Sequence, residues 1–103
     1  MSVPEQDWKT FKRLRPLALD RLCQRTLDEA QALIQDSSLT AHQRYLALYA
    51  LIERRDRQIA QAFNRFSRSS ACLALTYMRS FQLLEDHEVA EFSAEMQAAS
   101  RVG

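Results

Sequence analysis

The sequence predicts an all-α protein, a small antiparallel helical bundle built from a helical hairpin and one or two further helices. Three observations favour this fold class. The 103 residues include one glycine, the terminal Gly103, and two prolines, Pro4 and Pro16, so most of the chain lacks strong helix breakers. Asn64 is the only asparagine, although the tight turns of sheet proteins favour glycine, asparagine and proline. Good helix formers dominate the rest.

Composition places the chain among ordinary globular domains. Hydrophobic residues make up 47% and charged residues 26%, close to the globular average. A chain of 103 residues is expected to form one domain with a small core, and such domains often gain stability by dimerisation. We therefore expect a bundle that a second copy could complete. The net charge of +1 is far from that of a polycation.

The sequence also predicts a location in the cytoplasm. No apolar run is long enough for a membrane span, and charged residues interrupt the N-terminal segment, which lacks the apolar stretch of a signal peptide. Cys23 and Cys72 lie far apart and form no CxxC pair. In a reducing compartment these residues are expected to be free thiols.

Residues 1–15 are predicted to form an N-terminal arm, followed by a helical bundle domain at 16–100. Trp8 and Phe11 are three residues apart, so a short helix would put them on one side, against the body of the protein or a partner. Pro16 suits the first turn of a helix. The first long helix is then expected at about 17–35. Its apolar stripe is Leu19, Cys23, Leu27, Ala30 and Ile34, widened by Leu22 and Leu33.

The segment after this helix predicts the turn of a helical hairpin. Asp36 and the two serines that follow end the first helix, and Thr40 with Gln43 matches a capping box. In this motif each side chain satisfies an end amide of the next helix, which therefore begins near Ala41. The turn is expected at about 36–40.

Apolar residues then recur every three or four positions over 45–84, which is typical of a helix edge that packs against a neighbour. We call this set the predicted seam. It comprises Tyr45, Tyr49, Ile52, Asp56, Ile59, Phe63, Phe66, Ser70, Leu73, Tyr77, Phe81 and Leu84. One helix of more than forty residues or two helices would fit, and we favour a break near Ser67–Ser70, where a serine could cap the second helix.

A last helix is predicted after Asp86, which could cap it. Its apolar stripe is Val89, Phe92, Met96 and Ala99. Residues 101–103 are expected to fray.

Basic residues gather on one side of the second helix. At 100° per residue, Arg54, Arg57, Arg65 and Arg68 share a side roughly opposite Tyr49. This side could be simply solvated, could meet an acidic surface of another protein or a second copy, or could follow a phosphate backbone. A nucleic-acid domain usually has an overall basic excess, which this chain lacks.

The seam also contains polar groups. Asp56 would need a hydrogen-bonding partner if buried, from another helix or another subunit. Tyr45, Tyr49 and Tyr77 could line a polar-edged pocket with this carboxylate, the kind of place where bundles bind ligands. The simpler interpretation makes the tyrosines large core residues whose hydroxyls reach the edge, and makes Asp56 a paired or partly solvated carboxylate that fixes helix register.

The sequence contains no motif for a cofactor or a metal. The histidines and cysteines lack the spacing common in zinc sites, and neither a P-loop nor a glycine-rich dinucleotide turn is present. The carboxylates and imidazole at Glu85–Glu88 fit a solvated helix cap better than an acid–base site. Cys72 would lie on the arginine side of its helix, where its thiol could be reactive, or it could be covered by a neighbouring helix.

These patterns predict a non-catalytic cytoplasmic helical protein that acts through protein–protein interaction or regulation, with another protein or a second copy as its partner. The first alternative is a nucleic-acid-associated protein that uses the basic side of the second helix. The second alternative is a small-ligand binder or an enzyme with a pocket near Asp56 and the seam tyrosines.

Overall fold

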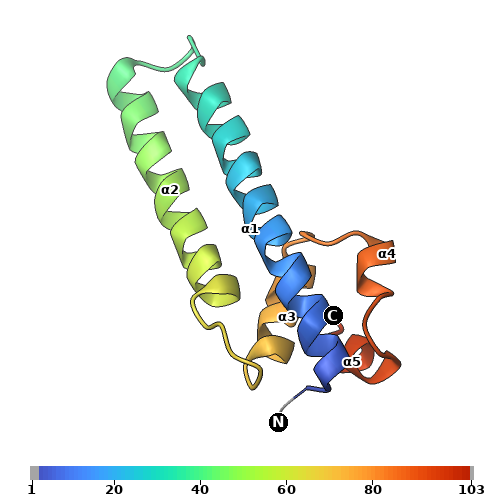
Figure 1. Ribbon diagram of the computed structural model, residues 1–103. Coiled ribbons are helices and arrows are strands. Elements are labelled where there is room, and N and C mark those ends of the chain that lie inside the picture. Colours follow the sequence, from blue (N-terminus) through green and yellow to red (C-terminus); the bar gives the residue numbers. More distant parts are fainter. Residues whose placement is uncertain (1–2, 103) are drawn as a thin grey trace.

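The computed structural model describes residues 3–102, and within them every regular element is a helix. The elements are α1 (Glu5–Ile34), α2 (Ala41–Phe63), α3 (Ala71–Ser80), α4 (Asp86–Val89) and α5 (Ala94–Ala99). Helices α1 and α2 run antiparallel as a long hairpin, and α3, α4 and α5 gather around one end of it (Figure 1). The all-α bundle predicted from the sequence is confirmed. The molecule measures 52 × 24 × 24 Å, because half of the hairpin projects beyond the other helices.

Helix α1 is a single helix of 30 residues that passes through Pro16. The predicted helix start at this proline is wrong, and the boundary drawn after residue 15 does not interrupt the helix. A proline inside a helix costs about 3 kcal/mol, but a buried stripe continues across it with steps of three or four residues. This stripe is Asp7, Phe11, Leu14, Ala18, Leu22, Thr26 and Ala30. Pro16 itself is exposed, so its ring displaces no core side chain.

The first turns of α1 pack on the body of the protein. The rings of Trp8 and Phe11 stack with their centroids 5.8 Å apart, and Phe66 lies 5.3 Å from the first and 6.5 Å from the second. The buried carboxylate of Asp7 accepts hydrogen bonds from the backbone N–H of Ser93 at 2.8 Å and from its hydroxyl at 2.6 Å. These contacts tie the start of the chain to the segment before α5.

The predicted hairpin turn is confirmed, with its capping box. The Thr40 hydroxyl accepts a hydrogen bond from the Gln43 N–H at 3.1 Å, and the Gln43 side chain accepts one from the Thr40 N–H at 2.9 Å. At the other side of the turn, the Asp36 carboxylate accepts hydrogen bonds from the side chain and backbone of Ser38. These two bonds lower the pKa of Asp36, the side-chain bond more than the backbone one.

The predicted break between two helices is also confirmed, since α2 ends at Phe63 and α3 begins at Ala71. The proposed serine cap is wrong. Ser70 occupies the N-cap position without a capping hydrogen bond from its side chain, and its backbone N–H instead donates to the hydroxyl of Ser67 at 3.2 Å.

The last predicted helix is two short helices. The first, α4, ends at Val89. Ser93 begins the second, α5, because its hydroxyl accepts a hydrogen bond from the N–H of Met96 at 3.1 Å. The residue before α4 is Glu85, so Asp86 is the first helical residue and not the cap. Arg101 and Val102 are exposed and lie outside the helices, and Gly103 falls outside the described residues.

The hydrophobic core lies at one end of the hairpin, where α3 and α5 meet the first half of α1 and the last turns of α2. Its most enclosed large apolar side chains are Phe11, Leu14, Leu75, Met78 and Leu83. The projecting half of the hairpin lies outside this core, so several of its large apolar side chains remain exposed.

None of the described helices is long and apolar enough to cross a membrane.

Candidate interaction surfaces

The projecting half of the hairpin exposes large apolar side chains on both of its helices. We call this set the hairpin surface. It comprises Leu27 (62% exposed), Ile34 (53%), Tyr45 (65%), Leu46 (51%), Tyr49 (59%) and Ile52 (43%). Apolar side chains that are exposed singly are common on proteins, but a group of them on one element typically marks a site of interaction.

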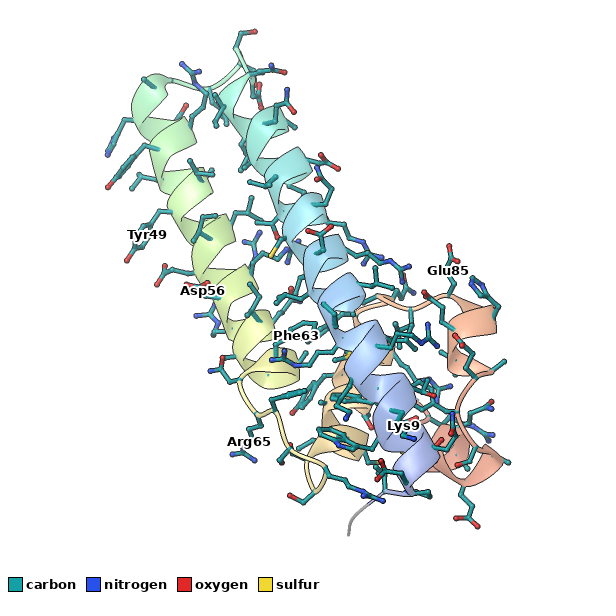
Figure 2. All side chains as sticks on the ribbon, in the orientation of Figure 1. Lys9, Tyr49, Asp56, Phe63, Arg65 and Glu85 are labelled. Atoms are coloured by element: carbon teal, nitrogen blue, oxygen red, sulfur yellow. The ribbon has the colours of Figure 1, made fainter. Side chains whose placement is uncertain are left out.

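The predicted seam is wrong for the first half of α2. Tyr45, Tyr49 and Ile52 are exposed, and the residue that packs against α1 is Leu51, which is 2% exposed. Tyr49 and Asp56 project from the side of α2 that faces away from α1, whereas Phe63 lies on the side toward α1 (Figure 2). The second half of the seam is confirmed only in part. Phe63 is buried in the core, and Ile59, Tyr77, Phe81 and Leu84 pack partly buried against it, whereas Phe66 (47%) and Leu73 (51%) are exposed.

The predicted stripe of α1 is confirmed only in part. Ala30 and Leu22 are buried as expected, whereas Leu27 and Ile34 are exposed and Thr26 is buried instead. The buried stripe through Leu22, Thr26 and Ala30 therefore lies along one edge of the expected stripe. In the projecting half, Thr26 and Ala30 of α1 and Leu51 of α2 are buried, whereas the large apolar side chains of Leu27, Ile34, Tyr45 and Tyr49 are exposed.

Asp56 is exposed, so its carboxylate does not need the hydrogen-bonding partner that burial would require. Its side chain makes neither an ion pair nor a hydrogen bond within residues 3–102. Its neighbour Arg55 pairs instead with Glu29 of α1 at 2.7 Å. Asp56 is thus a charged group at the end of an apolar row, with no partner in the described part of its own chain.

The structure does not gather the pocket candidates into one enclosed site. Tyr45, Tyr49 and Asp56 are exposed along α2, while Tyr77 is half-buried on α3 with its ring 6.0 Å from that of Phe81. Tyr77 lines a separate open groove of about 290 Å³, together with Ala60, Gln61, Arg65 and Leu73. The ligand-binding alternative therefore has no shared cavity at these four residues.

Most arginines hold the fold together. Eight of the twelve donate hydrogen bonds to carboxylates or backbone carbonyls of the same chain. They are Arg13, Arg15, Arg21, Arg25, Arg44, Arg55, Arg68 and Arg79. The guanidinium group provides five donors in a fixed planar fork, which suits the exposed carbonyls at helix ends.

Three of the four arginines predicted to share a basic side do not hold other parts of the described chain in place. Arg54, Arg57 and Arg65 are exposed and make no ion pair or hydrogen bond with any other residue of the described range 3–102. Arg68 differs, because it lies beyond α2 and donates to the Val3 carbonyl at 2.6 Å and the Glu5 carboxylate at 2.7 Å. The basic surface is thus Arg54, Arg57 and Arg65, and Arg68 belongs to the fold.

The strongest electrostatic contact joins α1 to α4. Arg21 donates to both carboxylate oxygens of Glu88, at 2.6 and 2.9 Å, and to the backbone carbonyl of Leu83 at 2.9 Å. Glu88 is buried and also accepts a hydrogen bond from the Glu85 N–H at 2.8 Å. The hydrogen bonds from Arg21 are the main cause that lowers the pKa of Glu88 to about 2, and burial opposes them. The same pair raises the pKa of Arg21.

Neither cysteine is bonded to another, and both are half-buried. Cys72 lines a groove of about 390 Å³ with Arg68, Val3, Glu95 and Met96. Within residues 3–102, no three His, Cys, Asp or Glu side chains gather in a way that could hold a metal ion.

Sequence reasoning missed Leu46 as an exposed group and the Arg21–Glu88 pair. Leu46 follows a seam residue directly and gives no periodic signal of its own. The ion pair joins residues 67 positions apart, and nothing in the local pattern of either helix predicts it. No family model, curated protein or solved structure matches the chain.

Proposed function

We propose that the protein is a non-catalytic helical protein that binds a partner protein through the hairpin surface. One observation carries the proposal: six large apolar side chains are 43–65% exposed on the half of the hairpin that lacks core neighbours. Two free cysteines agree with the proposed location in the reducing cytoplasm.

The energy available from this surface suits association. Burying a large apolar side chain contributes roughly 1.5–3 kcal/mol, so covering six that are already half-buried contributes on the order of 5–9 kcal/mol before the costs of association. The aromatic rings of Tyr45 and Tyr49 are of the kind that concentrates binding energy at interfaces. A partner that presents an apolar helix would fit the ridges of α2.

Photo-crosslinking tests this function. With p-benzoylphenylalanine in place of Tyr49, illumination of cells that express the full chain should give a discrete crosslinked species, because the group would sit inside the interface. The matched control is the same group in place of Gln61, which is exposed on the other side of α2. Ile52→Asp should abolish the crosslink formed at position 49. Crosslinking of equal yield at both positions, or at neither, would count against a specific hairpin surface.

A second candidate function rests on the basic surface. Arg54, Arg57 and Arg65 are exposed and engaged by no group of the described residues, and unpaired guanidinium groups are suited to phosphate oxygens. If the protein binds nucleic acid here, titration of labelled DNA or RNA should show an affinity that falls steeply between 50 and 200 mM salt. Replacing these three arginines with glutamine should then make the slope of log K against log salt concentration shallower, by the amount that about three phosphate contacts contribute. Absence of binding at low salt would end this candidate.

A further inference from the structure

We infer that the partner on the hairpin surface is a second copy of the chain, with the two α2 helices packed antiparallel. In this arrangement Tyr45 of one copy lies opposite Asp56 of the other, and Tyr49 lies opposite Ile52. The inference rests on the proposed function, because it names the occupant of the same surface.

The spacing of the exposed row on α2 is symmetric. Tyr45, Tyr49, Ile52 and Asp56 follow one another at steps of four, three and four residues, so the row reads with the same spacing in both directions. A two-fold interface places one surface against itself, and each contact occurs twice. An antiparallel copy of the row therefore meets the first one position for position, so that one register satisfies both halves of the interface.

The chemistry of the opposed positions is complementary as well. Asp56 is an exposed carboxylate without an ion pair or hydrogen bond to the described residues of its own chain. The phenol of Tyr45, 65% exposed, is a hydrogen-bond donor of suitable reach. A buried tyrosine hydroxyl and a buried carboxylate each need a partner, and this register provides one to both. At the centre of the row, the ring of Tyr49 covers the side chain of Ile52.

The size of the surface suits a weak dimer. The row from Tyr45 to Asp56 spans 11 residue steps on α2, or about 16 Å, and two helices side by side are about 20 Å wide. The face is therefore roughly 320 Å², below the ~800 Å² that each partner buries in a standard interface, so we expect a dimer that dissociates on dilution. Leu27, Ile34 and Leu46 extend the apolar area beyond the row itself.

Sedimentation velocity over a range of concentrations tests the second copy. We expect a dimer, and Ile52→Asp should raise its dissociation constant about 30-fold or more, the loss typical of a central interface residue. Tyr49→Asp is a second variant with the same expected effect. Both positions are exposed in the single chain, so circular dichroism should show that the helices are kept. Arg54→Glu, on the opposite side of α2, should leave the dimer unchanged.

Disulfide crosslinking tests the register. In a background with Cys23→Ala and Cys72→Ala, a mixture of Tyr45→Cys chains and Asp56→Cys chains should form a covalent dimer on mild oxidation. Tyr45→Cys alone should not, because in the antiparallel register two copies of position 45 are separated by 11 residues, or about 16 Å, whereas a disulfide needs Cα atoms within about 7 Å. Efficient crosslinking of Tyr45→Cys alone would indicate a parallel pair and overturn the proposed register.

The outcomes distinguish the two proposals. If the purified chain stays monomeric at every concentration while position 49 crosslinks a different protein in cells, the second copy is excluded and the proposed function stands. If the chain is monomeric and position 49 crosslinks nothing, both fail. If the dimer forms but Ile52→Asp and Tyr49→Asp leave it intact, the interface lies elsewhere and the inference is wrong.

Discussion

Replacing Phe11 with alanine should lower the free energy of unfolding by about 3–5 kcal/mol, the range for deleting a buried phenylalanine side chain. Phe11 is 1% exposed and lies within the core cluster, where the neighbouring structure of α1 cannot collapse into the space that the ring leaves. A domain of this size has a total stability of roughly 5–15 kcal/mol, so the variant should lose a large part of it. Urea denaturation followed by circular dichroism measures the change.

The matched control is Lys9→Ala, on the same helix but exposed (Figure 2). This change should shift the free energy of unfolding by less than about 0.5 kcal/mol, as surface changes usually do. A much larger loss of stability for Phe11→Ala than for Lys9→Ala is expected if residues 5–15 are packed in the folded core. A Phe11→Ala variant as stable as the Lys9→Ala variant would show that the first turns of α1 are a detachable arm after all.

The hairpin and the break after α2 could be predicted because their signals are local. Thr40 and Gln43 satisfy each other's amides within one turn, and the serines at 67–70 interrupt a run of strong helix formers. Such signals need no knowledge of what packs against the helix. They are therefore visible in the sequence and hold in the structure.

The start of α1 could not be predicted from local signals, because tertiary packing decides it. A proline such as Pro16 usually begins a helix, and only the burial of Phe11 and Leu14 ahead of it shows that the helix was already formed. The break at Ser93 is a similar case. Its hydroxyl caps α5 and also donates to Asp7, a residue at the far end of the chain that no local pattern connects to it.

The side of α2 that enters the core was predicted wrongly because the helix carries two apolar rows. The row with larger side chains, Tyr45, Tyr49 and Ile52, was assigned to the core, but α1 packs against Leu51. In a single chain, the largest apolar residues are a guide to burial only where the fold supplies a neighbour. The residues that were wrongly assigned to the core are exposed, and for this reason they are the ones proposed to contact a partner.

Replacing Glu88 with glutamine should destabilise the protein by about 2–3 kcal/mol at neutral pH. The change removes the charge that accepts two hydrogen bonds from Arg21 and leaves a buried amide with fewer bonds. The pKa of Glu88 falls from an ordinary value of 4.5 to about 2. A depression of this size contributes roughly 3 kcal/mol, and solvent at the partly exposed Arg21 reduces this to about 2 kcal/mol.

The pH dependence separates this pair from other causes of destabilisation. Because the pKa of the folded state is the lower one, the contribution is complete above about pH 4.5 and is lost as the pH falls toward 2. The stability difference between the native chain and Glu88→Gln should therefore shrink between pH 4.5 and pH 3, as measured by urea denaturation at each pH. Glu91→Gln is the control, since its pair with Arg13 is exposed and should contribute less than about 1 kcal/mol. A difference for Glu88→Gln that stays constant from pH 7 to pH 3 would show that the ion pair does not hold α4 against α1.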